Sequence, residues 1–388
     1  MRRFDIEERR VRLARRHHLP RRSPSAEEAA AGAVGLHSSD PATVFLSALA
    51  RVDGFEVDDL ERALYDDRTL VRMLGMRRTL FVVGRETAAV MNAACTQALY
   101  APERRRTESF LEGHVDDPAG WLERVSAEVL EVLRRRGEAT AVELTTEIPE
   151  LGLKVPYGEG TKWAGVVGMS TRVLFLLATA GLILRGRPRG SWRSGQYRWA
   201  PVEIWLGEHL ADLPTEEARV ALLRRWLAGH GPATFTDISW WTGWGKGVTR
   251  KALDQSGAVE VDIEEAGSGW ALADDLEGSE PVEEWVALLP GLDPAPMGWK
   301  QREWFMGEHT PRLFDRNGNA GPMIWFNGRV VGGWSQRPDG EVAFRLLDDV
   351  GWEAAAAVER EADRLQQWLG GHRVIPRFRT PLEKELSG

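Results

Sequence analysis

The chain has 388 residues, a formal net charge of −8 and one cysteine, Cys95. Its length exceeds that of one compact core and predicts two to four modules. A single cysteine excludes disulfides and thiolate-rich zinc sites, and no apolar run is long enough to predict a membrane-spanning helix. With 43% hydrophobic and 28% charged residues the composition is typical of a globular protein, and the negative charge argues against indiscriminate binding of polyanions.

The first segment, residues 1–105, begins with a basic amphipathic stretch, MRRFDIEERRVRLARRHHL. That stretch lacks the apolar core and the cleavage site of a secretion signal, so we expect a cytoplasmic protein. A polar motif, GLHSSDP (residues 35–41), precedes an apolar helix predicted at 41–52. Further helices are predicted at 57–66 and 85–98, on either side of the segment LVRMLGMRRTLFVV, which ends in a strand.

The second segment, residues 106–200, has the clearest pattern. A helix is predicted at 117–137, because Asp117 can cap its start, Pro118 suits the first helical position and Gly137 ends it. A short helix, another helix through 168–179 and two strands around a Gly/Pro/Ser tip follow. This order of helix, helix-turn-helix and β-ribbon is that of a winged helix.

The third segment, residues 201–282, repeats the same order. A helix at 215–231 ends in glycine, and a short helix in PATFTDISWWTG leads to a predicted recognition helix in GKGVTRKALDQSG and a hairpin in AVEVDIEEAGSGWAL. The first segment is a more diverged version of this pattern. The sequence therefore predicts three tandem winged-helix domains.

The fourth segment, residues 283–388, is different. The stretches EEWVALLPGLDP, PMIWFNGRVVGGWSQ and EVAFRLL are strand-like, with a tight turn at Asn327-Gly328, and a helix is predicted at 352–370. We expect a small β-barrel or half-barrel closed by one helix. The whole chain is thus expected to be an α+β protein of three tandem winged-helix domains and a C-terminal β-barrel-like domain.

Charge is distributed unevenly along the chain. Residues 181–199 contain five arginines and no acidic residue, whereas residues 254–285 contain eleven acidic residues and no lysine or arginine. An acidic protein can still bind nucleic acid when one face concentrates positive charge. The 181–199 ribbon is the expected nucleic-acid contact, and the acidic hairpin of the third segment is not.

Several separated motifs resemble one known family. GLHSSDPATVFLSALAR, LVRMLGMRRTLFVV, LLPGLDP and RNGNAGPMIWFNGRVVGGW occur in the order found in the AlkZ/YcaQ-type winged-helix DNA glycosylases. The resemblance covers nearly the whole chain and implies tandem winged helices around a concave surface with a β-rich C-terminal domain. It also implies removal of alkylated purines, chiefly N7-alkylguanines and related crosslinks.

The resemblance places the catalytic motif on His37, Ser38 and Ser39, with Asp40 just beyond. In the family this motif reads glutamine, an apolar residue, then glutamine or aspartate, so neither catalytic side chain is kept. An N7-alkylated guanine is already cationic and leaves without protonation. His37 can then orient a water with help from Ser39, while Asp40 stabilises the sugar cation. The alternative is that Asp40-Pro41 is a helix start, with the serines serving the same helix end.

The Arg-rich ribbon is the main predicted DNA contact. Its arginines can neutralise phosphates, and Trp192 at its tip can act as a wedge that unstacks a base step. The damaged nucleotide must also be turned out of the duplex. Arg77 and Arg78 match a family segment near the active site and can clamp phosphates. The alternatives are a solvated wing packed against a neighbour, and surface charges on a strand edge. The predicted DNA-binding residues are Arg77, Arg78, Arg185, Arg187, Arg189, Trp192, Arg193 and Arg198.

Three functions remain open at this point. The first is a monofunctional DNA glycosylase acting on alkylated purines in damaged duplex DNA. The second is a non-enzymatic DNA-binding protein, such as a damage sensor or a transcriptional regulator, and the third is a winged-helix module for protein contacts. We expect a monomer at the nucleoid. No cofactor or metal is expected, because the histidines show no metal-ligand spacing and no Gly-rich phosphate loop follows a strand.

Overall fold

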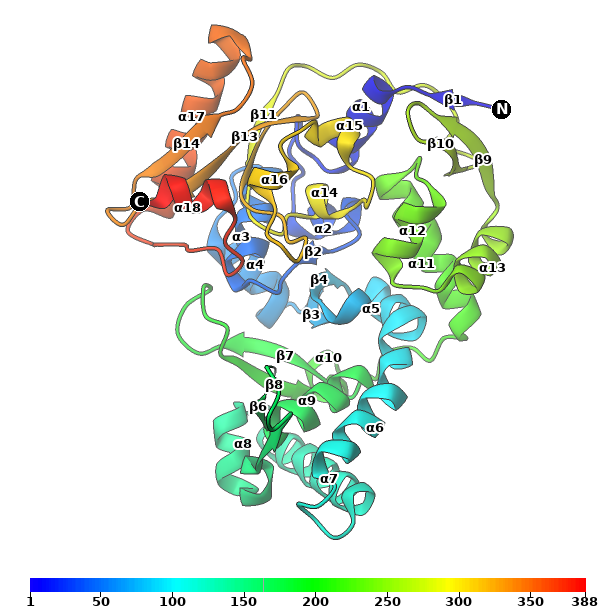
Figure 1. Cartoon of the computed structure of the whole chain (residues 1–388), viewed down its shortest axis with the longest axis vertical. Helices are drawn as coiled ribbons and strands as arrows, with labels where there is room; N and C mark the ends of the chain where they lie inside the picture. The colour runs from blue at the N-terminus through cyan, green and yellow to red at the C-terminus, as the bar shows by residue number, and fades with distance from the viewer. Residues whose placement is uncertain (163) are drawn as a thin grey trace.

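The computed structural model describes residues 1–162 and 164–388 and has a mixed α+β fold. The second segment forms the lower part of the molecule in Figure 1, and the other three segments form the upper part. Two large clusters of buried apolar residues follow this division. The smaller contains residues between Leu111 and Ile183, and the larger extends from Leu13 to Leu386. Within the described residues, no helix combines the length and apolar character that a membrane crossing needs.

The first segment contains most of the predicted helices. Those expected at 57–66 and 85–98 are confirmed, although π-type turns complete both, and the helix after the motif ends at Arg51. The elements are β1 (Arg3–Phe4), α1 (Ile6–Arg16), α2 (Ala26–Gly32), β2 (Leu36–His37), α3 (Pro41–Arg51), α4 (Val57–Glu61), η1 (Arg62–Asp66), β3 (Leu70–Leu74), η2 (Met76–Arg78), β4 (Leu80–Gly84), α5 (Arg85–Met91), η3 (Asn92–Thr96), η4 (Gln97–Leu99) and α6 (Tyr100–Leu111).

A three-stranded sheet carries the polar motif. Its strand order is β2-β4-β3, with antiparallel pairing throughout. The two-residue strand β2 places Leu36 opposite Val82 and His37 opposite Phe81. The sequence analysis predicted one strand of this sheet, β4 at the end of LVRMLGMRRTLFVV. It missed β2 and β3, because strands of two and five residues show little hydrophobic periodicity.

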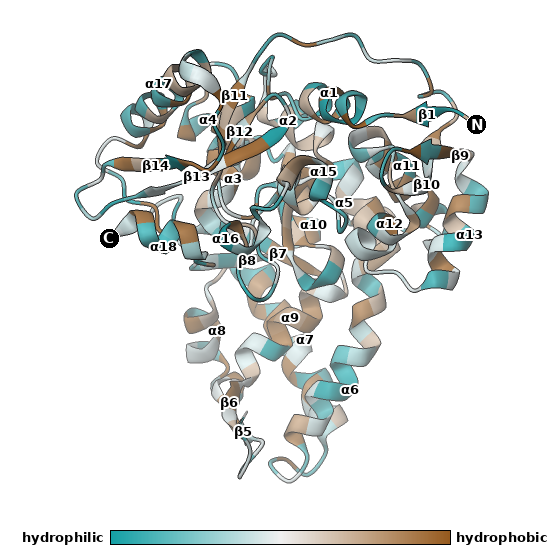
Figure 2. Ribbon diagram, turned by 45° about the horizontal axis from the view of Figure 1, so that its top comes forward, coloured by the Kyte–Doolittle hydropathy of each residue, from teal (hydrophilic) through white to brown (hydrophobic). Residues whose placement is uncertain are grey.

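The second segment contains the predicted helices and the predicted β7–β8 hairpin, and also a β5–β6 hairpin that the sequence analysis missed. Asp117 accepts a hydrogen bond from the backbone of Gly120 at the start of its first helix, and Gly137 ends that helix with a φ of 80°. Figure 2 shows mainly hydrophobic residues along the later helix α9, which packs against α7 and β7. The elements are α7 (Pro118–Arg136), α8 (Ala141–Glu147), η5 (Pro149–Gly152), β5 (Lys154–Tyr157), β6 (Gly165–Gly168), α9 (Met169–Thr179), β7 (Ile183–Pro188), β8 (Tyr197–Pro201) and α10 (Val202–Leu206).

The basic N-terminus forms ion pairs with the acidic stretch of the third segment. Strand β1 extends this hairpin by parallel pairing with β9. Asp275 forms ion pairs with Arg12 at 2.8 Å and with Arg16 at 2.6 Å, and Arg3 lies 3.7 Å from Asp262. The acidic stretch therefore faces the basic N-terminus, and these ion pairs do not involve the Arg-rich ribbon. The elements are α11 (Thr215–His230), α12 (Phe235–Thr242), α13 (Lys246–Ser256), β9 (Ala258–Ile263) and β10 (Gly267–Leu272).

The fourth segment is an open sheet, which corrects the expected barrel-like domain. Its order is β11-β12-β13-β14, and within the described residues the outer strands pair on one side only. Helices α17 and α18 pack on the sheet, so its apolar face is covered without closure. Asn327 and Gly328 form the predicted tight turn, with φ angles of 48° and 80°. The elements are β11 (Val286–Leu289), α14 (Pro294–Met297), α15 (Glu303–Met306), α16 (Thr310–Leu313), β12 (Met323–Phe326), β13 (Arg329–Gln336), β14 (Val342–Leu346), α17 (Gly351–Leu369) and α18 (Pro381–Ser387).

A buried ion pair joins the first segment to the fourth. Arg51, at the end of α3, contacts Asp293 at 2.7 Å, and both side chains are 0% exposed. Asp293 also accepts from the Ser47 hydroxyl at 2.7 Å and from the backbone N–H of Ala295 at 2.9 Å, which caps α14. The carboxylate therefore has a hydrogen-bond donor on each side, as a buried charge requires.

We predict that Asp293→Ala lowers the free energy of unfolding by about 3–5 kcal/mol, because Arg51 is left as an unpaired buried charge. Equilibrium denaturation with urea measures the loss. The matched control is Glu341→Ala, which removes an ion pair to Arg337 whose partners are 47% and 51% exposed. Such a surface pair is worth about 0–1 kcal/mol. Similar losses in both variants would contradict a special role for the buried pair.

Candidate functional site

The motif GLHSSDP joins the small sheet to helix α3. Backbone hydrogen bonding continues past β2, because the N–H of Ser38 donates to the carbonyl of Leu80 at 2.8 Å. Asp40 then caps α3, with Pro41 as the first helical residue. The motif is therefore held between a strand and a helix start, which fixes the direction of each of its side chains.

His37 is buried and neutral. Its side chain is 3% exposed, and its ring packs edge-on against Phe81 with 5.4 Å between centroids. Burial, with a smaller contribution from the charge of Arg77, lowers the pKa of His37 to about 3. Its Nδ1 accepts a long hydrogen bond from the N–H of Ser39 at 3.4 Å, which leaves the single ring proton on Nε2. This tautomer donates at Nε2, whereas the predicted water-orienting role requires an acceptor there.

The two serines are engaged in the fold. The Ser38 hydroxyl oxygen accepts from Arg72 Nε at 2.8 Å, and the Ser39 hydroxyl oxygen accepts from the Leu80 N–H at 3.3 Å. Each hydroxyl still has its own proton to donate. Ser39 can therefore donate to a water or a ligand, although its oxygen already helps to hold the motif against β4.

Asp40 is bound through both carboxylate oxygens. Oδ1 accepts from the Ala42 N–H at 3.1 Å, and Oδ2 accepts from the Arg377 N–H at 2.7 Å. Burial raises the pKa of this carboxyl, while the two backbone hydrogen bonds oppose that shift. The side chain thus caps α3 and also anchors the C-terminal tail, and this geometry favours the helix-start interpretation of the motif.

Five arginines around the motif lack a carboxylate partner within the described part of the chain. Arg72 bonds Ser38, and Arg377 donates from Nη1 to the carbonyl oxygen of Ser39 at 3.2 Å. The guanidinium of Arg77 lies 4.0 Å from the ring centroid of Trp240. We call this set the arginine cluster; its members are Arg72, Arg77, Arg185, Arg302 and Arg377.

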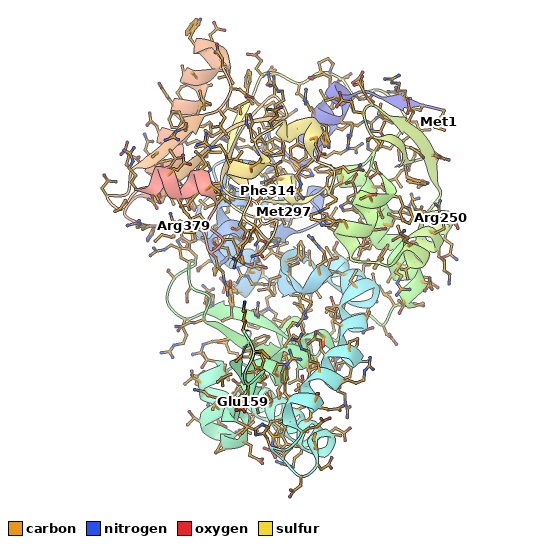
Figure 3. The ribbon with its side chains drawn as sticks, in the orientation of Figure 1. Met1, Glu159, Arg250, Met297, Phe314 and Arg379 are labelled. Atoms are coloured by element: carbon orange, nitrogen blue, oxygen red, sulfur yellow. The ribbon has the colours of Figure 1, made fainter. Side chains whose placement is uncertain are left out.

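Sequence reasoning found only two members of the arginine cluster, Arg77 and Arg185. Arg72 carried a readable signal, since it is a lone charge in the apolar run LVRML. Arg302 stacks 4.3 Å from the ring centroid of Phe314, a residue labelled in Figure 3. Arg302 and Arg377 come from the fourth segment. No local pattern shows that Arg377 bonds Ser39, or that Arg302 lies against the Trp240 ring that Arg77 also contacts.

Most of the other predicted DNA-binding arginines have partners inside the protein. Arg187 pairs with Glu61 at 2.6 Å and Arg198 with Glu138 at 3.4 Å. Arg78 pairs with Glu103 at 2.9 Å. Arg193 donates to the carbonyl oxygen of Arg373 at 2.6 Å. Arg189 is exposed at the hairpin tip, and the described residues offer its side chain no ion pair.

Trp192 is not the exposed wedge that the sequence predicted. It is 5% exposed, and its ring lies 5.1 Å from that of Phe45, 5.6 Å from that of Trp368 and 6.0 Å from that of His372. The hairpin tip folds back onto α3 and α17, so the large apolar ring is buried there instead of pointing into solvent. Trp192 therefore joins the second segment to the first and the fourth.

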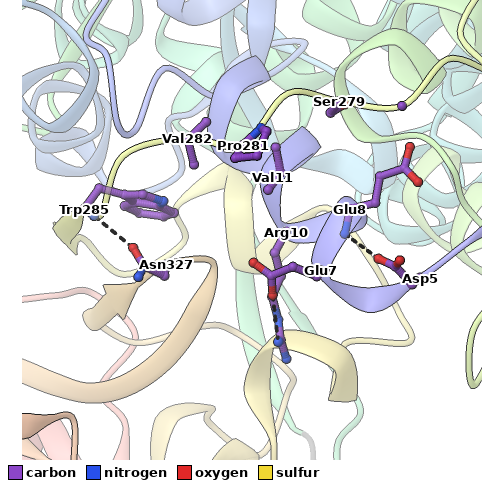
Figure 4. Close-up of a pocket in the computed structure, with 11 residues that line it drawn as sticks. Asp5, Glu7, Glu8, Arg10, Val11, Ser279, Pro281, Val282, Trp285 and Asn327 are labelled. Atoms are coloured by element: carbon purple, nitrogen blue, oxygen red, sulfur yellow. Dashed lines mark hydrogen bonds and ion pairs between the residues drawn. The ribbon is translucent and has the colours of Figure 1, made fainter.

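A surface hollow of about 380 Å³ lies between α1 and residues 278–285 (Figure 4). Its acidic side chains belong to the start of α1, where Asp5 accepts from the N–H of Glu8 at 2.7 Å and Glu7 lies 3.7 Å from Arg10. No motif residue lines it. Its acidic lining disfavours a nucleic acid, so the motif and the arginine cluster remain the candidate site.

A family model described as DNA glycosylase AlkZ-like matches residues 30–368. The chain belongs to the AlkZ-like DNA glycosylase family. Among solved structures it is similar to the Streptomyces sahachiroi DNA glycosylase AlkZ, with a TM-score of 0.72 and 22% identity over 95% of this chain and 97% of that one. A search of curated proteins found no match. The resemblance is thereby confirmed, and the mixed α+β fold is similar to that of the AlkZ structure.

We predict that Trp192→Ala lowers the free energy of unfolding by about 3–5 kcal/mol, because a buried aromatic ring leaves a cavity between three aromatic neighbours. Chemical denaturation followed by circular dichroism measures the change. Trp352→Ala is the matched control, since that ring is 79% exposed and its loss is worth about 0.5 kcal/mol or less. If Trp192→Ala hardly changes the free energy of unfolding, Trp192 is not a packing residue and the predicted wedge role would be favoured again.

Asp40→Asn tests the double use of that carboxylate. An amide offers one acceptor oxygen, so one of the two backbone N–H groups bonded by Asp40 loses its partner, at a cost of about 1–3 kcal/mol. Asp117→Asn is the control, because Asp117 caps α7 through one bond and asparagine caps about as well. Urea unfolding measures the stability loss of each variant relative to the wild type. Equal losses in Asp40→Asn and Asp117→Asn would show that the hydrogen bond from Asp40 to the C-terminal tail contributes nothing.

Proposed function

We propose that this protein is a DNA glycosylase that hydrolyses the N-glycosidic bond of N7-alkylated purines in duplex DNA. The observation that carries the proposal is the neutral imidazole of His37 at the family's catalytic position, flanked by arginines without carboxylate partners. Family membership supports the general reaction, since its members are described as DNA glycosylases.

The proposed reaction needs no general acid. An N7-alkylated purine carries a positive charge and becomes neutral when the glycosidic bond breaks, so no acid has to protonate it. The Nε2–H of His37 can donate a hydrogen bond to the departing purine as electron density flows into its ring. The sugar cation forms between the negative phosphates of the backbone, and water then attacks it. Turning the nucleotide out of the duplex costs a few kcal/mol, less where damage weakens pairing.

DNA would be held by the arginine cluster together with Arg189. Arginine without an internal carboxylate can neutralise a phosphate and release a counterion, which gives affinity that falls with salt. The helix, helix-turn-helix and hairpin order of α7 to β8 and of α11 to β10 supports winged-helix domains in the second and third segments. We further propose a third winged helix in the first segment, action as a monomer, and a location in the cytoplasm at the nucleoid.

One observation favours a second function, a non-catalytic sensor of damaged DNA. Both oxygens of Asp40 accept backbone N–H groups, so the only carboxylate of the motif is already committed to the fold. A protein of this kind would use the same arginines to bind DNA and would break no bond. Incubation with duplex DNA carrying N7-methylguanine distinguishes the two, because only the glycosylase generates abasic sites.

We predict that His37→Ala lowers the single-turnover excision rate by roughly 10²-fold, the typical effect of losing one hydrogen-bond donor at a reacting centre. DNA affinity should be nearly unchanged. His209→Ala, at an exposed histidine outside the motif, is the control and should keep the wild-type rate. Wild-type protein that binds duplex DNA and yields no abasic sites would favour the sensor.

The pH profile of excision tests the state of the imidazole. Burial holds the pKa of His37 at about 3, below the ordinary value of 6.5, so the ring stays neutral as the pH falls from 8 to 5. The excision rate should therefore be flat over this window and fall only as the pH approaches 3, where protonation of Nδ1 removes the acceptor of the Ser39 N–H and places a positive charge beside the cationic purine. A loss of activity centred near pH 6.5 would instead indicate a solvated histidine that accepts a proton from water.

A further inference from the structure

A cavity of about 160 Å³ lies between the first and second segments, next to the motif. Strands β3 and β4 form one side, and α8, α9 and the β7–β8 hairpin form the other; β7 lies beside β3 in Figure 1. Leu80, which holds Ser39, lines it. Its walls are apolar apart from Thr171 and two arginines, Arg72 and Arg185.

Arg72 is a buried cation with neutral partners only. The residue is 1% exposed, and its Nε and Nη1 donate to the Ser38 hydroxyl at 2.8 Å and to the Tyr65 hydroxyl at 2.6 Å. Within the described residues its Nη2 has no hydrogen-bond acceptor, and no carboxylate forms an ion pair with the group. The ring centroid of Tyr197 lies 4.6 Å from the guanidinium carbon.

Arg185 is the second cation of the cavity. Its guanidinium carbon lies 5.0 Å from the ring centroid of Trp199 and 5.6 Å from that of Tyr197, and the described residues offer it no ion pair. Burial and the charges of Arg72 and Arg377 lower the pKa of Arg185 to about 10, so it stays protonated at neutral pH. In contrast Arg187, two residues along the same strand, has Glu61 as a partner.

Two charged guanidiniums around one apolar cavity disfavour the empty state. Each buried charge loses its hydration, and the two repel each other. An anion relieves both costs, and the planar fork of arginine matches the oxygens of a phosphate. A cationic N7-alkylpurine would be repelled here. The volume equals that of about five water molecules, which is enough for a phosphate with its ester carbons.

We propose that this cavity is a phosphate-binding site formed by Arg72 and Arg185, which takes either a phosphodiester of the DNA backbone or a free phosphate monoester. The first of these sources rests on the proposed function, and the second does not. Because Arg72 also holds Ser38, the bound phosphate lies one hydrogen-bonded side chain from the motif.

Arg185→Gln tests the site without disturbing Ser38 and Tyr65, which depend on Arg72. Thermal unfolding and tryptophan fluorescence are followed while inorganic phosphate replaces chloride at constant ionic strength. Phosphate should raise the Tm of the wild type, because a ligand that binds only the folded state stabilises it. Its affinity should fall about tenfold or more in Arg185→Gln, the scale of a hydrogen bond between charged groups.

Arg105→Gln is the matched control, since it removes an exposed arginine of α6 outside the cavity, and it should bind phosphate as the wild type does. Arg185→Lys keeps the charge without the fork, and its phosphate affinity should fall between those of the wild type and Arg185→Gln. Equal phosphate affinity in the wild type, Arg185→Gln and Arg105→Gln would overturn the proposal, as would the absence of any response to phosphate.

Two further arms distinguish the sources. One adds 2-deoxyribose 5-phosphate, and the other uses duplex DNA with a stable abasic analogue flanked by one neutral methylphosphonate. If the neutral linkage weakens wild-type binding and leaves Arg185→Gln unaffected, the ligand is a backbone phosphodiester; if only the sugar phosphate competes, it is a monoester. None of these measurements requires excision, so a protein without glycosylase activity can still confirm the site, and an active one can still fail to bind phosphate here.

Discussion

The buried contact between Arg51 and Asp293 is the constraint on which the candidate site depends. Helix α3 begins at the motif and ends at Arg51, so the ion pair fixes the far end of the helix against the fourth segment. At the near end, Asp40 bonds the backbone of Arg377, which belongs to the same segment. The helix is therefore held at both ends by residues more than 240 positions away in sequence. The motif can be rigid because neither end of α3 can move alone.

This arrangement gives the motif residues two tasks. Asp40 caps a helix and anchors a tail, and Ser38 receives the hydrogen bond of a buried arginine. Side chains bound in this way have little freedom to move toward a substrate. His37 is different, because its only hydrogen bond is a long one to the N–H of Ser39 and its Nε2 proton has no partner in the described structure. Within the described residues, His37 is thus the motif residue whose side chain is least engaged by the fold.

The distribution of arginine partners matters more here than the number of arginines. The Arg-rich hairpin looks like a polyanion-binding element, yet Arg187, Arg193 and Arg198 are engaged by other parts of the protein. A charge that already faces a carboxylate gains little from a phosphate, because the new contact replaces an existing one. The arginines around the motif have aromatic rings and hydroxyl groups as neighbours, so their charges remain available to an anion.

The sequence by itself determined the longer helices and the family, whereas several short strands were not predicted. Helix α7 was readable from Asp117, Pro118 and Gly137, because capping and helix termination depend on neighbouring residues. The order of motifs was enough to identify the AlkZ-like resemblance. Only the tertiary structure decided that Trp192 is buried, that Arg377 reaches the motif, and that the fourth segment is an open sheet. Each of these features depends on contacts between distant segments. The partner segment decides whether a residue is buried and whether its charge is paired, and the neighbouring residues in sequence do not indicate which segment that partner is.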